Sequence, residues 1–274
     1  MSRLVRFSIV MFIIVIMGLT VACGVKDNSV GNNTGQEKDK NGSVEKHLMV
    51  YCGAGLRKPV EALGNSFREK TGIIIDYSFG NAAQNVNQIL TTDKGDAFIP
   101  GDMAELKPIR EKEKIAAEKD VVLHTPVLAV PKGNPAGIKG LKDLTKPGIK
   151  VVLGDNKATP IGKLADKAFT KAGIMDQVEK NVVARTATAN ELFTYLSMKQ
   201  ADASIVWEDT VLNNDKIEVV PTQDLDKFIK TVGVVTLKSS QDAESSAKFA
   251  EFVSSDEGMA IWKQMGFKAA PAER

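Results

Sequence analysis

From residue 47 onward, short apolar runs alternate with segments in which apolar residues recur every three or four positions. Apolar runs bounded by glycine, proline or polar residues predict β-strands, whereas the wider spacing predicts helices with one buried face. The predicted strands are 47–52, 72–79, 97–99, 121–130, 150–155, 181–185, 203–207 and 232–237. The predicted helices include 58–70, 160–172, 189–199, 243–253 and 257–265. This alternation predicts an α/β fold built on mixed, mainly parallel sheets flanked by helices.

The length of this body suits two lobes between which the chain crosses twice. We expect the first crossing at His124 and Thr125, because a Pro- and Gly-rich connection follows the strand that contains them. A second crossing after residue 238 would return the two terminal helices to the first lobe. We therefore expect lobe I to comprise 47–124 and 239–274, and lobe II to comprise 125–238.

Residues 1–22 have the layout of a secretory signal: Arg3 and Arg6, an apolar run over 9–17, and small residues before Cys23. The run is shorter than the ~20 apolar residues that cross a bilayer, so we expect cleavage and not a permanent membrane anchor. Cys23 stands where bacterial lipoproteins carry their lipidated cysteine, and cleavage at an ordinary secretion site is the alternative. We expect Cys23 to hold the protein at a membrane face. Residues 23–46, rich in Asn, Gly, Lys and Ser, are expected to form a flexible tether.

The composition argues against several classes of function. The formal net charge of +2 comes from interspersed lysines and acids, without a basic block among aromatics, so we expect no nucleic-acid binding. Because the sequence has neither a complete GxGxxG nor a GxxxxGK[ST] loop, we expect no cofactor. No serine lies in a GxSxG motif, and the adjacent acids Glu208 and Asp209 diverge on an extended chain. We therefore expect a binding protein and not an enzyme.

Three further features have a structural interpretation. Cys52, the only cysteine besides Cys23, ends an apolar strand, and we expect it to be a small buried hydrophobe. Arg185 also ends a strand, where it could bring positive charge to a ligand or form a surface ion pair, and we favour the ion pair. The charged run 112–119 is typical of a solvated helix face, although it could dock a partner.

Four turns between a strand and the following helix are rich in small residues: 52–56, 79–83, 158–162 and 185–192. The first turn of a helix has backbone N–H groups without intrahelical partners and a partial positive charge, so it attracts anions without a charged side chain. In open α/β sheets ligands lie beyond the carboxyl ends of strands, so turns from two facing lobes would converge on one cleft. The pattern indicates a site for a small anion.

The segments around these turns resemble the molybdate-binding proteins of ABC transporters, the ModA family. The resemblance rests on LMVYCGAGLRKPVEALGNSFREKTG, YSFGNAAQNVNQI, HTPVLAVPKGNP, VVLGDNKATPIGKLADKAF, TANELFTYL and SSDEGMAIWKQMGF, and it covers the whole body. It implies the two-lobed type II periplasmic-binding fold, in which hydroxyl groups and backbone N–H donors hold molybdate or tungstate. Sulfate, phosphate and ferric-ion binders share this architecture, so other ligands stay open, as does a role as a sensor subunit.

Carried over position by position, the resemblance implies a set of ligand-binding residues. Gly55 and Asn81 stand where the family has serines, and Trp207 stands where it has a tyrosine. Thr125 lies at the expected crossing, and the turns in lobe II would offer backbone N–H groups. The implied positions are Gly55, Asn81, Thr125, Ile161, Ala189, Asn190, Trp207 and Glu208.

Glu208 departs from the family, because an ionised carboxylate beside a dianion is repulsive. In the related tungstate- and molybdate-binding branch called WtpA, carboxylates complete a six-coordinate metal, so Glu208 could be a ligand here. We favour the interpretation that it points to solvent or pairs with a lysine. The resemblance also implies a permease with its ATPase as partners. We expect a monomer that contacts the membrane through its lipid anchor.

Overall fold

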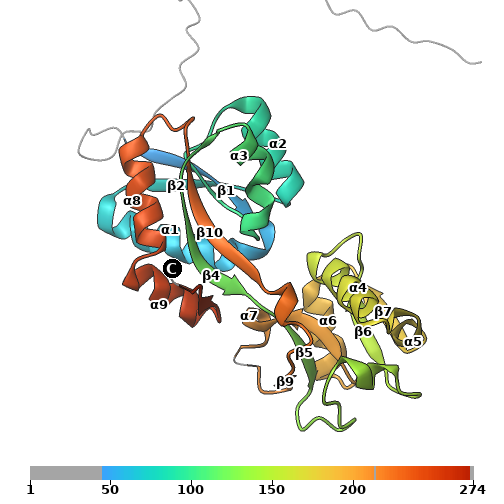
Figure 1. The fold of residues 1–274 in the computed structure, drawn as a ribbon. Coiled ribbons are helices and arrows are strands. Elements are labelled where there is room, and N and C mark those ends of the chain that lie inside the picture. The colour runs from blue at the N-terminus through green and yellow to red at the C-terminus, as the bar shows by residue number, and fades with distance from the viewer. Residues whose placement is uncertain (1–44, 213, 272–274) are drawn as a thin grey trace, which may run out of the picture. The chain divides into compact units, whose positions relative to one another are not determined.

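The computed structural model describes residues 45–212 and 214–271. The expected signal 1–22, Cys23 and nearly all of the expected tether 23–46 lie outside these residues. The body has a two-lobed α/β architecture in which strands and helices largely alternate along the chain (Figure 1). Within 45–212 and 214–271, no helix is both long enough and apolar enough to cross a bilayer.

Lobe I is built on a six-stranded sheet with the strand order β11-β4-β10-β3-β1-β2. Its strands are β1 (His47–Gly53), β2 (Ile74–Gly80), β3 (Ala97–Ile99), β4 (Ile115–His124), β10 (Lys230–Leu237) and β11 (Lys268–Ala269). The parallel pairing expected from the alternation holds for β1 with β2 and with β3. β10 is antiparallel to β3 and β4, and β11 is antiparallel to β4. The carboxyl ends of β1, β2 and β3 therefore share one edge of the sheet.

Helices pack on both faces of this sheet, because successive side chains of a strand point to opposite faces. They are α1 (Arg57–Thr71), α2 (Ala82–Thr92), α3 (Lys107–Glu111), α8 (Ala243–Val253) and α9 (Asp256–Gln264), with the 3-10 turns η1 (Ala54–Leu56) and η2 (Met103–Leu106). On β1, Val50 and Cys52 enter a core that contains Trp262 of α9. The residue between them, Tyr51, enters a second core with Ile89 of α2. Lobe I therefore has two apolar cores, one on each face.

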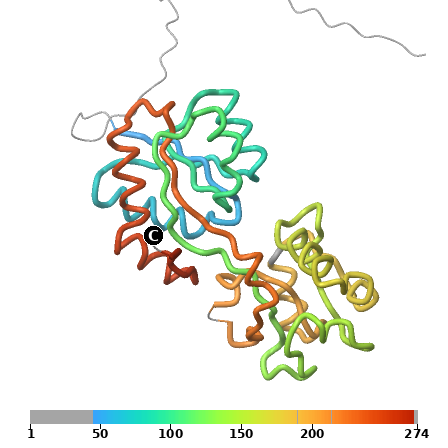
Figure 2. Tube along the Cα trace, viewed as in Figure 1, coloured from blue at the N-terminus to red at the C-terminus, as the bar shows by residue number. Residues whose placement is uncertain are grey.

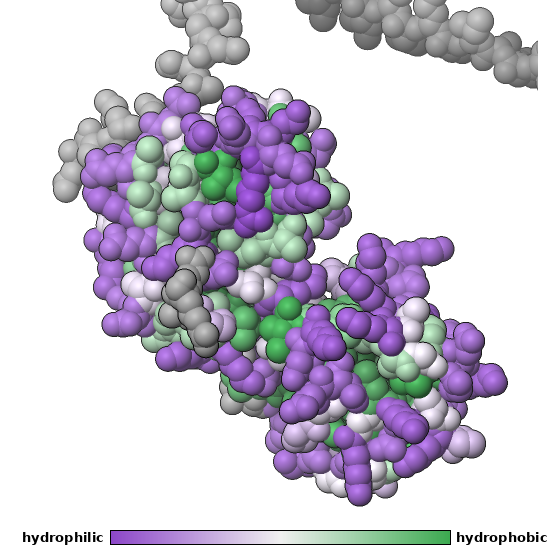
Figure 3. All heavy atoms as spheres, in the orientation of Figure 1, coloured by the Kyte–Doolittle hydropathy of each residue, from purple (hydrophilic) through white to green (hydrophobic). Residues whose placement is uncertain are grey.

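Lobe II surrounds one contiguous core. Its strands are β5 (Pro126–Pro131), β6 (Val151–Gly154), β7 (Val182–Thr186), β8 (Ser204–Trp207) and β9 (Ile217–Val220). Its helices are α4 (Pro160–Ala172), α5 (Met175–Glu179), α6 (Ala189–Ser197) and α7 (Glu208–Val211), with η3 (Leu141–Thr145) and η4 (Asp226–Phe228). β5 is antiparallel to β8 and β9, whereas β6 and β7 are parallel. Hydrophilic residues predominate on the face drawn in Figure 3, with apolar patches between them.

Helix α4 illustrates how local sequence fixes an element. It has the predicted bounds, and the Thr159 hydroxyl caps it by accepting the N–H of Gly162 at 3.1 Å. Proline occupies the first helical turn, where a missing N–H costs nothing. Gly173 ends the helix in the left-handed region with φ 69°, which favours glycine. The cap, the proline and the glycine together set where the buried face of α4 begins and ends.

Three segments differ from the sequence expectation. The expected lobe II, 125–238, includes 230–237, whereas this strand, β10, pairs with β3 and β4 in the sheet of lobe I. The charged run 112–119 is not a helix face, because from Ile115 onward it forms the first half of β4. Pairing with β10 holds this half in the sheet although its side chains are largely exposed. The unpredicted β11 is two residues long and exposed, so no apolar pattern marks it.

The two crossing segments between the lobes lie side by side. Lys230, at the start of β10, pairs with His124, at the end of β4, and Figure 2 shows these strands adjacent along their length. Helix α7 of lobe II also approaches lobe I, since a Cβ on Gly266 would lie 2.8 Å from the Cα of Asp209. Gly266 has φ 94°, a conformation that favours glycine. The junction therefore joins β4, β10, α7 and the turn before β11.

Candidate functional site

The first predicted turn follows β1 at the sheet edge. η1 begins after Gly53 and α1 after Leu56, and neither N-cap residue contributes a side-chain hydrogen bond. Ala54 and Gly55 are exposed, and nothing beyond the chain neighbours lies within 4 Å of the position of a Cβ on Gly55. Because the first N–H groups of a helix have no intrahelical partner, this turn leaves backbone donors at an exposed position.

The second turn is closed by a capping box at the start of α2. Asn81 Oδ1 accepts the N–H of Gln84 at 3.0 Å, and Gln84 Oε1 accepts the N–H of Asn81 at 3.0 Å. The Asn81 amide nitrogen remains as a donor, and the N–H groups of Ala82 and Ala83 have no intrahelical partner. The cap thus engages an acceptor of Asn81 and leaves donors, which suits an anionic ligand.

Asn85, which is 1% exposed, ties the first two turns together. Its Nδ2 donates to the carbonyl oxygen of Cys52 at 3.0 Å and to that of Gly80 at 3.3 Å. A Cβ on Gly80 would lie 2.7 Å from Asn85 Oδ1, so the absence of a side chain at Gly80 makes room for this contact. Asn85 therefore holds the ends of β1 and β2 in a fixed relation. This role of Asn85 could not be predicted from the sequence, because Cys52 is 33 residues away in the chain.

The third turn joins β6 to α4. Besides capping Gly162, the Thr159 hydroxyl donates to the Asp155 carbonyl oxygen at 2.9 Å. Ile161 is 1% exposed and lies in the first turn of α4, where its N–H has no intrahelical partner. The Asp155 carboxylate accepts two backbone N–H groups of its own turn at 2.8 and 2.9 Å, and they lower its pKa. The turn therefore contains both the Ile161 N–H and an ionised carboxylate.

The fourth turn leads from β7 into α6, with Thr188 as the N-cap residue. Ala189 and Asn190 are the first residues of α6, so their N–H groups have no intrahelical partner. Glu191 follows them, and its carboxylate accepts the Ala187 N–H at 3.2 Å and the Thr188 hydroxyl at 3.1 Å. A carboxylate near the positive end of a helix is stabilised there. An anionic ligand at this turn would therefore compete with the Glu191 carboxylate.

The lobe junction holds the tryptophan implied by the resemblance. Trp207 is 8% exposed and stacks on His124, with ring centroids 3.8 Å apart and an interplanar angle of 23°. His124 Nε2 lies 3.3 Å from Asp209 Oδ1 across the junction. The Thr125 carbonyl oxygen accepts the Glu208 N–H at 2.9 Å. Thr125, directly before β5, thus lies next to Trp207 at the end of the paired strand β8, and Trp207 is stacked against His124 of lobe I.

Glu208 forms an ion pair at this junction. Its Oε1 accepts from Lys268 Nζ at 2.7 Å, which matches the interpretation that it pairs with a lysine. Glu208, Lys268 and Thr125 line a pocket of about 690 Å³ whose wall includes residues 219–223. Trp207 and the four turns do not line this pocket. The Glu208 carboxylate is therefore neutralised on a surface apart from the donors that the turns present.

Lys230 lies near Trp207, and two acidic residues, Asp102 and Glu105, lie close to Lys230. Lys230 Nζ lies 3.8 Å from Asp102 Oδ2 and 6.0 Å from the centre of the Trp207 ring system. Asp102 follows β3 and caps η2 by accepting the Ala104 N–H at 3.0 Å. Burial raises the pKa of Glu105, and the nearby Lys230 ammonium acts in the opposite direction. These residues meet only because β10 lies next to β3 in the sheet.

Two residues that the sequence analysis interpreted structurally have structural contacts. Cys52 is buried, and burial raises the pKa of its thiol, so it is a small hydrophobe as expected. Arg185 forms ion pairs through Nη2 with Asp166 at 3.1 Å and with Glu179 at 2.6 Å. Its charge is therefore directed toward α4 and α5, as the ion-pair interpretation predicts.

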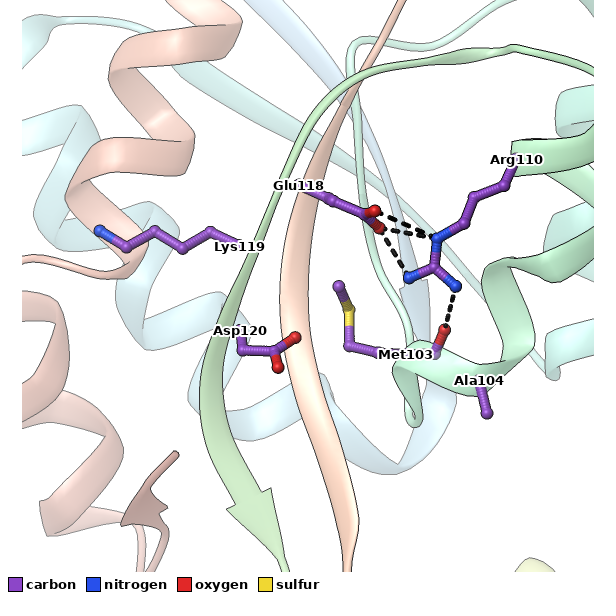
Figure 4. A pocket seen from close by; sticks show the side chains of 6 residues that line it. All are labelled: Met103, Ala104, Arg110, Glu118, Lys119 and Asp120. Atoms are coloured by element: carbon purple, nitrogen blue, oxygen red, sulfur yellow. Dashed lines mark hydrogen bonds and ion pairs between the residues drawn. The ribbon is translucent and has the colours of Figure 1, made fainter. Parts of the chain in front are cut away.

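A second pocket, of about 310 Å³, lies beside η2, α3 and β4, and no implied ligand residue lines it (Figure 4). The Arg110 guanidinium donates to the Glu118 carboxylate at 2.9 and 2.7 Å and to the Met103 carbonyl oxygen at 3.3 Å. Lys119 and Asp120 point to opposite sides of β4. The arginine of this pocket is thus engaged within lobe I and is not available to an oxyanion.

The structure gathers the implied ligand residues into three groups. In lobe I, β1 and β2 end in register, so the first two turns are neighbours. In lobe II, β6 and β7 end in register, so the other two are neighbours. Within 45–212 and 214–271, no hydrogen bond or ion pair joins the turns of one lobe to those of the other. The groups are Gly55 with Asn81; Ile161 with Ala189 and Asn190; and Thr125 with Trp207 and Glu208.

Comparison with known proteins supports a common architecture. A Haemophilus influenzae protein that is provisionally named a binding protein is 29% identical over 225 residues, which are 81% of this chain and 91% of that protein. The molybdate-binding protein ModA of Mycobacterium tuberculosis is 22% identical over 81% of this chain and 84% of its own length.

Solved structures show the same fold. The substrate-binding domain of a provisionally named molybdenum ABC transporter from Clostridium difficile has a TM-score of 0.71 and 24% identity, covering 83% of this chain and 100% of that chain. Iron-bound HitA from Pseudomonas aeruginosa has a TM-score of 0.65 and 19% identity, over 84% and 90% of the two chains. These likenesses establish the two-lobed type II periplasmic-binding fold.

The family assignment rests on a match to a family model over most of the chain. Residues 48–268 match the family described as bacterial extracellular solute-binding proteins, from β1 to the start of β11. The matched region contains all four turns, both crossings and the junction around Trp207. The chain therefore belongs to the family of bacterial extracellular solute-binding proteins.

Proposed function

We propose that this protein is the substrate-binding component of an ABC transporter and that it captures molybdate or tungstate between its lobes. In this proposal each lobe supplies hydrogen-bond donors from two turns, and closure of the lobes excludes water from the bound anion. The cargo then passes to a permease that works with an ATPase. The protein itself performs no chemical step on its ligand.

One observation carries the proposal: the first turn presents uncapped backbone donors at an exposed position. Gly55 has open space where a side chain would be, and no side chain caps η1 or α1. A tetrahedral oxyanion needs several converging donors and few acceptors, which helix starts supply without counter-charges. The amide nitrogen of Asn81 and the N–H of Ile161 extend the same donor set in the two lobes.

The names of relatives support the choice of anion. Mycobacterial and Rhodobacter capsulatus relatives with 22% and 24% identity are named molybdate-binding proteins, and the Clostridium difficile domain belongs to a transporter named for molybdenum. A sulfate-binding relative and an iron-bound neighbour share the fold, so the experiment must include those ligands.

Isothermal titration of the purified body with molybdate, tungstate, sulfate, phosphate and ferric ion tests the proposal. We expect sub-micromolar binding of molybdate or tungstate and no response to sulfate or phosphate. Tight binding of only phosphate, only sulfate or only a metal cation would overturn the assignment.

A matched pair of tryptophan variants tests the location of the site. Trp207→Phe keeps an aromatic ring on His124 but removes the indole N–H, and a lost hydrogen bond to a charged group costs about 1.5–3 kcal/mol. We expect the affinity for the oxyanion to fall about tenfold or more. The control Trp262→Phe removes an indole N–H that donates to the Val253 carbonyl oxygen in the core of lobe I. It should lower stability and leave affinity unchanged; equal affinities of both variants would place the ligand elsewhere.

We also propose that Cys23 anchors the mature protein to a membrane through acyl chains. Cys23 lies outside the described residues, so the proposal rests on the sequence pattern before it. Metabolic labelling with palmitate should mark the wild-type protein and Cys52→Ser, but not Cys23→Ser. Label on the Cys23→Ser protein would contradict the anchor.

Delivery to a permease is tested in the producing cell. Deleting the gene should abolish high-affinity uptake of labelled molybdate, and the intact gene should restore it. Normal uptake in the deletion strain, together with molybdate binding by the purified protein, would favour the sensor alternative over transport.

A further inference from the structure

Lys230 places a positive charge where the two lobes meet. It begins β10, next to the crossing, and its backbone pairs with His124 of β4. Its ammonium lies 6.0 Å from the centre of the ring system of Trp207, which is the last residue of β8 in lobe II. Trp207 in turn stacks on His124. The Lys230 ammonium is therefore held beside the aromatic residue that the proposed site uses.

Asp102 links this ammonium to the donor turns of lobe I. The turn that carries Asp102 touches the first turn, because a Cβ on Gly53 would lie 3.2 Å from the backbone nitrogen of Gly101. Asp102 Oδ2 lies 3.8 Å from Lys230 Nζ, and the two side chains are 24% and 26% exposed. A separation of 3.8 Å is an ion pair without a short hydrogen bond, so the ammonium keeps donors for another partner.

Two acidic side chains, those of Asp102 and Glu105, lie close to Lys230. Burial raises the pKa of Glu105, the Lys230 ammonium lowers it, and the Asp102 carboxylate raises it further, so all three groups lie within electrostatic reach of one another. A buried carboxyl near a second carboxylate is stabilised by any cation that stays close to both. An anion that draws the ammonium away from Asp102 must therefore compete with carboxylates for it. That competition favours a ligand with a high charge over a neutral or weakly charged one.

We infer that Lys230 binds the oxyanion directly and that Asp102 occupies the ammonium while no ligand is bound. The inference rests on the proposed function and deepens it, because it adds one charged donor to a set that was otherwise neutral. Binding transfers the Lys230 ammonium from the Asp102 carboxylate to an oxygen of the ligand, beside Trp207. Lys230 and Asp102 thus set the selectivity of the site for doubly charged anions.

A purely structural ion pair makes a different prediction. If Lys230 and Asp102 only support each other, then removing either partner weakens the junction, and both variants bind worse or equally. If Asp102 competes with the ligand, removing its charge frees the ammonium and removes a repulsive carboxylate. The two variants must then change affinity in opposite directions. Asp102→Asn retains a side-chain oxygen that can accept the Ala104 N–H, so the cap of η2 is preserved.

The test measures molybdate and tungstate binding by isothermal titration for the wild-type protein, Lys230→Met, Asp102→Asn and the control Lys238→Met. Lys238 directly follows β10 and is exposed, so its substitution changes net charge equally away from the junction. We expect Lys230→Met to weaken binding at least tenfold, Asp102→Asn to tighten it severalfold, and Lys238→Met to match the wild type. The wild-type affinity should also fall more steeply with added chloride than that of Lys230→Met.

The outcomes separate this inference from the proposed function. Suppose that the wild-type protein binds the oxyanion but Lys230→Met has an unchanged affinity, or that Lys230→Met and Asp102→Asn both bind more weakly. Either result overturns only the role of Lys230 and leaves the proposed function intact. A wild-type protein that binds neither oxyanion overturns the proposed function and this inference together. Circular dichroism and thermal melts verify folding of each variant. Should Lys230→Met not fold, Lys230→Gln replaces it, and the opposite shift of Asp102→Asn remains decisive.

Discussion

Replacing Gly162 by alanine adds one methyl group where α4 begins against the end of β6. A Cβ at this position would lie 2.1 Å from the carbonyl oxygen of Gly154 and 2.8 Å from the carbonyl carbon of Asp155, both of which belong to the backbone. Because comfortable contacts between heavy atoms need about 3.5 Å, the start of α4 must move by about 1 Å. The substitution therefore displaces the third donor turn without changing any polar side chain.

Overpacking and helix propensity change the stability of Gly162→Ala in opposite directions, and the displacement of α4 changes its affinity. Overpacking costs about 1–3 kcal/mol. Alanine is favoured over glycine in a helix by about 1 kcal/mol, so we expect the free energy of unfolding to fall by up to about 2 kcal/mol. The same shift moves the Ile161 N–H, and a hydrogen bond to a charged group is worth about 1.5–3 kcal/mol. Oxyanion affinity should therefore fall about tenfold or more.

Urea denaturation measures the first quantity, and isothermal titration with molybdate and tungstate measures the second. Gly55→Ala is the matched control for stability, because it adds the same methyl group where nothing beyond the chain neighbours lies within 4 Å. If Gly162→Ala shares the urea midpoint of Gly55→Ala and keeps the wild-type affinity, the close approach of α4 to β6 does not control the site, and the reasoning fails.

Gly55→Ser should restore a hydroxyl donor in open space and tighten oxyanion binding about 2- to 10-fold in titration, whereas weaker binding would mean that the turn does not face the ligand. Burial raises the pKa of the Cys52 thiol, so an aromatic disulfide reagent at pH 8 should react with it only after denaturant is added; rapid labelling of the native protein would contradict its burial. Hydrogen bonds from the Ser245 backbone and hydroxyl, then from Lys46, lower the pKa of Asp242 to about 2. Since the usual value is about 3.9, this contribution is present above that pH and lost as the pH falls toward the folded value. Asp242→Ala should therefore lower the urea midpoint at pH 7 and have a smaller effect near pH 2, and a pH-independent difference would refute the linkage.

Helices with an apolar stripe are predictable from the sequence, because the stripe is what packs. The spacing over 160–172 and 243–253 predicts α4 and α8 with the bounds that the structure has. Phe169 and Phe249 are both fully buried, and residues of this size have few alternatives to the core. The first half of β4 lacks such a signal, since its exposed charged side chains are held in the sheet by backbone hydrogen bonds to β10.

The candidate site also contains both predictable and unpredictable parts. Its donor turns are local features, so glycines and small residues between a strand and a helix indicate them in the sequence. The ion pair of Lys230 with Asp102 is not local, because it depends on β10 lying beside β3. The same applies to Asn85, whose partner carbonyl oxygens end two different strands. Residues that position the site or bring charge to it therefore cannot be predicted without the order of strands in the sheet.

The place of β10 in lobe I determines the order in which the protein can be completed. Val232 of β10 and Trp262 of α9 share a core with Val50 of β1, so this core needs both ends of the body. The core of lobe II draws on one uninterrupted stretch, from Val127 to Phe228. During folding, lobe II can close before β1 has paired, because contacts between residues close in the chain form with a smaller loss of chain entropy. Pulsed hydrogen exchange on the refolding chain should protect the amides of β6 before those of β1, and the reverse order would exclude this sequence of events. The first strand of the body in the sequence, β1, is then among the last to be paired on both sides.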